Sequence, residues 1–256
     1  MGLDSGANSL QSSIIGNTLG GNRAMQALCA TGVIITDIGY AMVSKWVKST
    51  SASSSASRID RIVIDSRNRS ESNKVPNEQK TAVVTGANCG IGYETAKALG
   101  RAGFHTILAC RNAEQGKEAV ERLERQTGLE DRFEVMALDL ASLESVRAFV
   151  EAFKARDCTL DILVNNAGVA CPYNQTKDGI EMQFGTNHVG HFALTLGLLD
   201  CLKRAEDGSR VVIVSSMAAY MVARISYDGI EQKEKFFSMR NYALSKLANM
   251  TFAKAL

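Results

Sequence analysis

The sequence has no marked excess of charge of either sign. Its 256 residues carry 29 lysines and arginines against 27 aspartates and glutamates, and residues 80–256 carry 21 of each sign. Binding to nucleic acid depends on a local concentration of basic side chains. The composition therefore predicts no nucleic-acid partner, while an apolar content of 45% is enough for a substantial core.

Patterns that bind metal ions are also missing. The six cysteines form no Cys-x-x-Cys pair and have no histidine companion at metal-ligand spacing. We predict no metal site, and we expect reduced, buried thiols of an intracellular protein. The cysteines are Cys29, Cys89, Cys110, Cys158, Cys171 and Cys201.

Long apolar runs are scarce, and only residues 24–43 approach the length of a membrane span. Asp37 and two glycines interrupt this run, and a spanning helix requires about 20 residues. Lys45 and Trp46 follow it as an interfacial flank would, and the serine-rich residues 49–57 are typical of a flexible linker. The run therefore predicts a weak membrane anchor.

The first 79 residues differ in composition from the rest of the chain. Acidic residues are scarce in the first 36 positions, which is also typical of an organelle-targeting peptide. A poorly ordered extension is the third alternative. We expect an N-terminal extension over residues 1–79 that serves for membrane association through residues 24–43, for targeting, or for neither.

A glycine-rich segment, TGANCGIG at residues 85–92, lies between the apolar residues 82–84 and a stretch with helical spacing. This predicts a strand, a tight turn and a helix. Glycines there turn the chain with positive φ, admit the pyrophosphate of a dinucleotide, and let helix and strand pack closely. The helix N-terminus adds free N–H groups and partial positive charge. The residues expected to hold the dinucleotide here are Gly86, Asn88, Cys89, Gly90, Ile91 and Gly92.

From residue 80 onward, apolar strands alternate with helical patterns. Continuous apolar strands separated by helices indicate a parallel sheet covered on both faces, which binds ligands at the carboxyl ends of its strands. The predicted fold class is α/β, a Rossmann-type doubly wound parallel sheet over residues 80–256. Further strands are expected at 105–110, 133–138, 162–164 and 211–214, and helices near 113–126, 143–155 and 184–203.

Six stretches make the chain resemble the short-chain dehydrogenases/reductases. In the family's order they are TGANCGIG at 85–92, Asp139, NNAG at 165–168, Asn187, Ser216, and Tyr242-x-x-x-Lys246. ACRN at 109–112, DLASLESVR at 139–147 and GTNHVGHF at 185–192 are most similar to the branch that contains retinol dehydrogenases, the WW-domain oxidoreductase and protochlorophyllide reductase. The resemblance implies an NAD(P)-binding oxidoreductase.

The resemblance also implies a catalytic set. Tyr-x-x-x-Lys occurs three times, but only Tyr242 follows the serine-bearing fifth strand. Its phenol would exchange a proton with the substrate oxygen, Lys246 and an oxidised nicotinamide ring would each lower the phenol's pKa, and Lys246 would also bind the ribose. Ser216 would donate to the substrate oxygen, and Asn187 would hold a water that links the lysine to solvent. A turn-capping role is the alternative for Ser216.

The nearby histidines, His188 and His191, are expected to be structural.

Cofactor choice depends on the end of the second strand. Cys110 and Arg111 stand where an acidic residue would select NAD, and an arginine can pair with a 2′-phosphate. We therefore favour NADP(H) over NAD, with a solvated turn residue as the alternative role of Arg111. The resemblance places Asp139, Leu140, Asn166, Ala167 and Gly168 beside the same cofactor, and NNAG as a brace for the sheet.

The chain ends at Leu256, whereas members of the family continue with a sixth strand, a Pro-Gly turn and a seventh strand. We therefore expect a sheet that is truncated after its fifth strand and the start of the following helix, with the edge of that strand exposed.

The predicted function is NADP-dependent interconversion of a small-molecule alcohol and carbonyl, with a hydrophobic substrate implied by the retinol dehydrogenases. The alternatives are a catalytically inactive NADP-binding or scaffold protein and a protochlorophyllide-reductase-like enzyme. The glycine spacing argues against an extended-type epimerase. The sequence does not indicate an oligomeric state.

Overall fold

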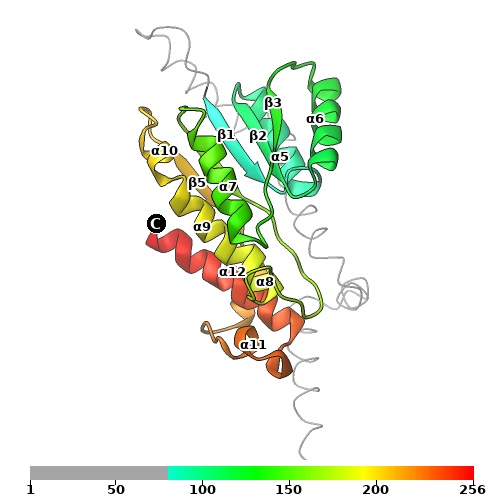
Figure 1. The fold of residues 1–256 in the computed structure, drawn as a ribbon, viewed down its shortest axis with the longest axis vertical. Helices are drawn as coiled ribbons and strands as arrows, with labels where there is room; N and C mark the ends of the chain where they lie inside the picture. The colour runs from blue at the N-terminus through cyan, green and yellow to red at the C-terminus, as the bar shows by residue number, and fades with distance from the viewer. Residues whose placement is uncertain (1–79) are drawn as a thin grey trace, which may run out of the picture. The chain divides into compact units, whose positions relative to one another are not determined.

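In the computed structural model, which describes residues 80–256, five strands form one parallel sheet (Figure 1). The strands are β1 (Thr81–Thr85), β2 (His105–Cys110), β3 (Phe133–Ala137), β4 (Ile162–Asn165) and β5 (Arg210–Ile213). Their order is β3-β2-β1-β4-β5, so the chain runs outward from β1 to β3 and then returns to the other side of β1. This order confirms the doubly wound, Rossmann-type fold, and folds of this type bind ligands at the carboxyl ends of the strands where the order reverses, here β1 and β4.

Helices and single turns lie between the strands, and the last four of them follow β5. They are α5 (Gly90–Arg101), α6 (Ala113–Thr127), α7 (Leu143–Lys154), α8 (Met182–Phe184), the π-helical turn η1 (Gly185–Val189), α9 (Gly190–Gly197), α10 (Leu199–Lys203), the 3-10 turn η2 (Met217–Met221), α11 (Asp228–Glu231), the 3-10 turn η3 (Lys233–Lys235) and α12 (Ser238–Ala255).

The two faces of the sheet are buried by different helices. Val83 and Ile107 point to the face packed by α7, α9 and α10, whereas Val84 and Leu108 point to the face packed by α5 and α6. Figure 1 shows α5 and α6 on one side of the strands and α7 and α9 on the other. Successive strand residues alternate between faces, so a sheet buried on both faces requires the continuous apolar runs seen in the sequence.

Local signals set the ends of several helices. Asn112 caps α6 by accepting the Gln115 N–H at 3.1 Å, and Gly128 ends that helix with φ of 67°. Ser142 likewise caps α7 by accepting the Ser145 N–H at 3.3 Å. Polar N-caps and a left-handed glycine at the carboxyl end are the expected terminators.

The helix predicted over residues 184–203 is present, but it contains the π-helical turn η1 and a break at Leu198, so that it is divided into α8, η1, α9 and α10. Gly190 permits the close approach of this segment to the Leu140 carbonyl, since a Cβ at residue 190 would lie only 2.5 Å from that oxygen. The helix that carries Tyr242 begins at Ser238, so Tyr242 lies in its second turn and not at its start.

The expectation of buried thiols holds for some cysteines only. Cys110 and Cys201 are buried, as expected. Cys89 is exposed in the glycine turn, so the prediction was wrong at that position. Among residues 80–256 no helix combines the length and apolarity needed to cross a bilayer. The predicted anchor at 24–43, the linker and Cys29 lie outside the described residues and stay predictions.

Candidate active site

Three glycines shape the turn that follows β1. Gly86 has φ of 63° and Gly90 has φ of 58°, conformations that residues with a Cβ rarely adopt. Gly92 lies on α5, and a Cβ there would be 2.5 Å from both the Gly86 carbonyl oxygen and Asn166 Nδ2. The turn therefore needs glycine at each of these positions, twice for backbone conformation and once for close packing.

Hydrogen bonds from the end of β4 hold the turn in place. The Thr85 hydroxyl oxygen accepts the backbone N–H groups of Asn166 and Ala167, both at 2.9 Å. Asn166 Nδ2 donates to the Thr85 carbonyl at 2.8 Å. The NNAG segment thus fastens two neighbouring strands where their carboxyl ends meet. The sequence singled out Asn166 and Ala167 but missed Thr85.

The amino end of α5 is free to meet an anion. Cys89 is its N-cap residue and makes no side-chain capping bond, and the first turn contains no acidic residue. Unbonded N–H groups and the helix dipole favour phosphate at such an end. The glycine conformations and the open space around a Cβ at Gly90 fit the approach of a dinucleotide phosphate.

Arg122, on α6, is a second cation near this turn that the sequence did not reveal. Its Nη2 donates to the Asn88 carbonyl at 2.8 Å, and its guanidinium lies 4.9 Å from the centre of the Tyr93 ring. No motif marks it, because the contact depends on how α6 packs beside α5. Arg111, the predicted 2′-phosphate partner, is exposed directly after β2.

The other predicted cofactor residues occupy different surroundings. Asp139 Oδ1 accepts the Ala141 N–H at 3.1 Å, and Oδ2 lies 3.5 Å from Lys177 Nζ. The Leu140 side chain is buried in the core cluster that includes residues of α7 and α9, and its contact with a cofactor stays a prediction. A Cβ on Gly168 would lie 3.4 Å from Lys246 Nζ, which places Gly168 beside the predicted catalytic lysine.

The structure brings three predicted catalytic side chains together. The Ser216 hydroxyl lies close enough to the Tyr242 phenol to lower its pKa, and Lys246 Nζ lies 5.7 Å from the centre of the Tyr242 ring. Ser216 also accepts the Ala218 N–H at 3.2 Å, so it caps η2 while it contacts the tyrosine. Ser215 instead donates to the Lys246 carbonyl at 2.8 Å.

Burial sets the ionisation of this group. Burial raises the pKa of the Tyr242 phenol, and the Ser216 hydroxyl opposes part of the rise. Burial lowers the pKa of the Lys246 ammonium to about 8, and Nζ donates to the Val214 carbonyl at 3.1 Å. In the protein alone burial dominates the pKa of the phenol, and the lowering expected from Lys246 and an oxidised nicotinamide ring stays a prediction.

Asn187 lies in η1 and is fully buried. Its side chain accepts the Val169 N–H at 2.7 Å and donates to the Val169 carbonyl and to Ser245 Oγ, both at 3.0 Å. Its carbonyl accepts from His191 and from Asn249 Nδ2, both at 3.0 Å. Protein groups thus occupy the positions through which Asn187 was expected to hold a water, and that role stays a prediction.

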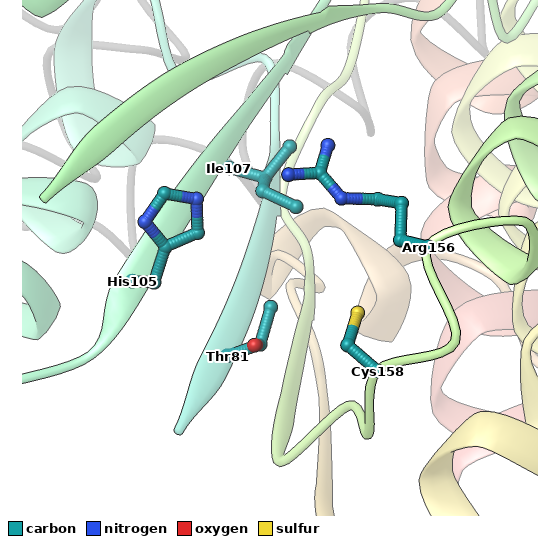
Figure 2. A pocket seen from close by; sticks show the side chains of 5 residues that line it. All are labelled: Thr81, His105, Ile107, Arg156 and Cys158. Carbon is teal, nitrogen blue, oxygen red and sulfur yellow. The ribbon is translucent and has the colours of Figure 1, made fainter. Parts of the chain in front are cut away.

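A separate cavity of about 320 Å³ opens near the amino ends of β1 and β2, away from the glycine turn (Figure 2). Thr81, His105, Ile107, Arg156 and Cys158 line it. Beside it, Arg156 forms two hydrogen bonds with Glu134, at 2.6 and 2.7 Å, which hold the pKa of that carboxyl below its usual value. None of the predicted site residues lines this cavity.

Comparison with known proteins agrees with this geometry. Residues 80–256 match the family model described as short chain dehydrogenase. Retinol dehydrogenase 11 of Mus musculus is 47% identical over 179 residues, which cover 69% of this chain and 55% of that protein. The chain thus spans about half the length of the curated relatives it matches.

Two solved structures share the fold. An uncharacterised protein of Mycobacterium paratuberculosis has a TM-score of 0.60 at 41% identity, covering 69% of this chain and 61% of that one. The RhlG/NADP complex of Pseudomonas aeruginosa has a TM-score of 0.54 at 27% identity, covering 69% and 64%.

Proposed function

Because this chain belongs to the short-chain dehydrogenase family, we propose that it is an NADP(H)-dependent oxidoreductase that interconverts an alcohol and a carbonyl. The observation that carries the proposal is the joint burial of Tyr242 and Lys246 with Ser216 in contact with the phenol. A buried phenol and a buried amine cost free energy that the fold alone does not require, and such groups concentrate at functional sites.

Each side chain has a role that its surroundings support. The raised pKa of Tyr242 keeps the phenol protonated, which is the form that donates a proton to a carbonyl oxygen. The Ser216 hydroxyl orients that phenol and can donate to the same substrate oxygen. Lys246 supplies a positive charge below a pH of about 8, which stabilises negative charge on the phenolate after transfer. Bound NADPH would supply the hydride.

The chain's own residues also suggest how the dinucleotide is held and selected. The glycine turn and the amino end of α5 would bind the pyrophosphate, and Arg111 the 2′-phosphate. RhlG, solved with NADP, shares the fold. Met217, Tyr220 and Met221 follow Ser216 and are more than half exposed, which suits an apolar substrate such as the retinol named in the relatives.

The test is NADPH consumption with a panel of apolar aldehydes. Tyr242→Phe is expected to lower kcat by roughly 10²- to 10⁴-fold, the usual contribution of a general acid, with NADPH affinity retained. Tyr93→Phe is the matched control, because Tyr93 begins another Tyr-x-x-x-Lys and its hydroxyl has no hydrogen-bond partner among the described residues. NADPH binding without turnover by the unaltered protein would instead favour a nucleotide-binding protein that is not an enzyme.

A further inference from the structure

One buried side chain joins two segments that are far apart in the sequence, the glycine turn after β1 and the π-helical turn η1. His191 lies on α9 and is 1% exposed. Its Nε2 lies 2.8 Å from Thr85 Oγ1, and its Nδ1 lies 3.0 Å from the Asn187 carbonyl oxygen. The imidazole therefore spans the distance between the residue that braces the glycine turn and the residue at the centre of η1.

The partners fix where the protons lie. A carbonyl oxygen only accepts, so His191 must carry its proton on Nδ1, and Nε2 is then an acceptor. Thr85 Oγ1 accepts two backbone N–H groups, and its own hydrogen has two acceptors within reach, His191 Nε2 at 2.8 Å and the Val164 carbonyl at 3.4 Å, of which the nearer is His191. Burial lowers the pKa of His191 to about 4, which keeps the ring neutral at physiological pH.

At the other end of the chain of hydrogen bonds, Asn187 forms part of the wall beside Lys246. Its side chain is bonded to both backbone polar groups of Val169. Val169 follows Gly168, and a Cβ on Gly168 would lie 3.4 Å from Lys246 Nζ and 3.5 Å from Asn187 Oδ1. A displacement of Asn187 would therefore change the surroundings of the lysine amine.

We propose that His191 is a positioning residue that couples the conformation of the glycine turn to that of η1. The coupling runs through the hydrogen bonds from Thr85 to His191 and from His191 to Asn187. In the proposed function this connection has a consequence: a dinucleotide held at the glycine turn stabilises the arrangement around Lys246. His188, although nearby, hydrogen-bonds to the Asn249 side chain of α12 at 3.1 Å and packs against the rings of Phe184, Phe192 and Phe252, and none of these contacts leads to the turn.

Hydrogen exchange of the backbone amides of residues 185–189, measured without cofactor, tests the connection. Thr85→Val removes the donor to His191 and is expected to speed this exchange about fivefold or more, the low end of typical coupling between sites. Thr85→Ser keeps the hydroxyl and should leave the exchange rate unchanged. In a His191→Asn background, where the shorter amide reaches Asn187 but not Thr85, Thr85→Val should add nothing. Equal acceleration in both backgrounds would overturn the proposal.

A second arm tests the consequence with NADPH. Bound NADPH should slow exchange at residues 185–189 in the unaltered protein and in the control variant His188→Asn. It should not do so in His191→Asn, nor in His191→Gln, whose longer amide reaches Thr85 but not Asn187. Slowing that persists in both His191 variants would refute the link. If fluorescence titration shows no NADPH binding by the unaltered protein, the proposed function fails, while the Thr85 comparison still decides the role of His191.

Discussion

Adding one methyl group at Gly92 is the sharpest perturbation of the candidate cofactor site. The new Cβ would lie 2.5 Å from the Gly86 carbonyl oxygen and from Asn166 Nδ2. Neither neighbour is free to give way, because Asn166 Nδ2 is bonded to the Thr85 carbonyl at 2.8 Å and Gly86 forms the turn itself. Non-bonded atoms prefer about 3.5 Å or more, so α5 and the turn must separate by roughly 1 Å.

The cost follows from this overpacking. Gly92→Ala is expected to lower the free energy of unfolding by about 1–3 kcal/mol, the usual range for an added group in a packed site. Because the displaced turn is the proposed phosphate site, the Kd for NADPH should rise by about tenfold or more, which corresponds to about 1.4 kcal/mol. Fluorescence titration measures the Kd, and urea denaturation measures the free energy of unfolding.

Gly128→Ala is the matched control. Gly128 has φ of 67° and open space where its Cβ would lie, at the end of α6 away from the glycine turn. It should lose about 1–2 kcal/mol of stability through backbone strain alone, with the Kd for NADPH unchanged. The reasoning is refuted if Gly92→Ala binds NADPH as the unaltered protein does, or if both variants weaken binding equally.

Three further predictions follow from charge. Lys246→Met should abolish turnover yet raise the free energy of unfolding at pH 7 by about 1–3 kcal/mol, because it removes a buried ammonium whose pKa is lowered to about 8; a less stable variant in urea denaturation would contradict this. His191 has a pKa of 6.5 in the unfolded state and of about 4 in the folded state, so between these pH values only the unfolded state binds the proton. The free energy of unfolding should therefore fall by about 3 kcal/mol as the pH is lowered from 6.5 to 4. Denaturation curves of His191→Gln should lack this part of the pH dependence. Arg111→Ala should raise the Kd for NADPH about tenfold and leave that for NADH unchanged, whereas Arg101→Ala, at the far end of α5, should alter neither.

Most of the fold follows from local patterns in the sequence. The apolar strands, the polar caps of α6 and α7 and the glycine after α6 are each visible within a few residues, and the predicted strand and helix bounds lie close to the observed ones. Within the helical segment 184–203, no local pattern indicated the π-helical turn η1 or the break at Leu198, and the close approach of Gly190 to the Leu140 carbonyl likewise involves a residue far away in the sequence.

The candidate site was predictable to the same extent. Motifs indicated Tyr242, Lys246 and Ser216, which the fold brings together, and the three glycines of the turn. The contacts of Thr85, Arg122 and Asn249 were missed. The bond between Thr85 and His191 joins residues 106 positions apart, and no spacing rule reaches that far.

The buried polar groups near the site are of two kinds, those that are hydrogen-bonded within the protein and those whose pKa is shifted by burial. Thr85 and Asn187 are hydrogen-bonded to other groups of the protein, so they stabilise one local arrangement and are not available to react. Tyr242 and Lys246 are buried with pKa values shifted toward their neutral forms, so charging either one is costly. Thr85 and Asn187 can hold the surroundings of Tyr242 and Lys246 in place, because their hydrogen bonds do not use the phenol or the amine. Reactivity would therefore rest on the pair, and geometry on the network around it.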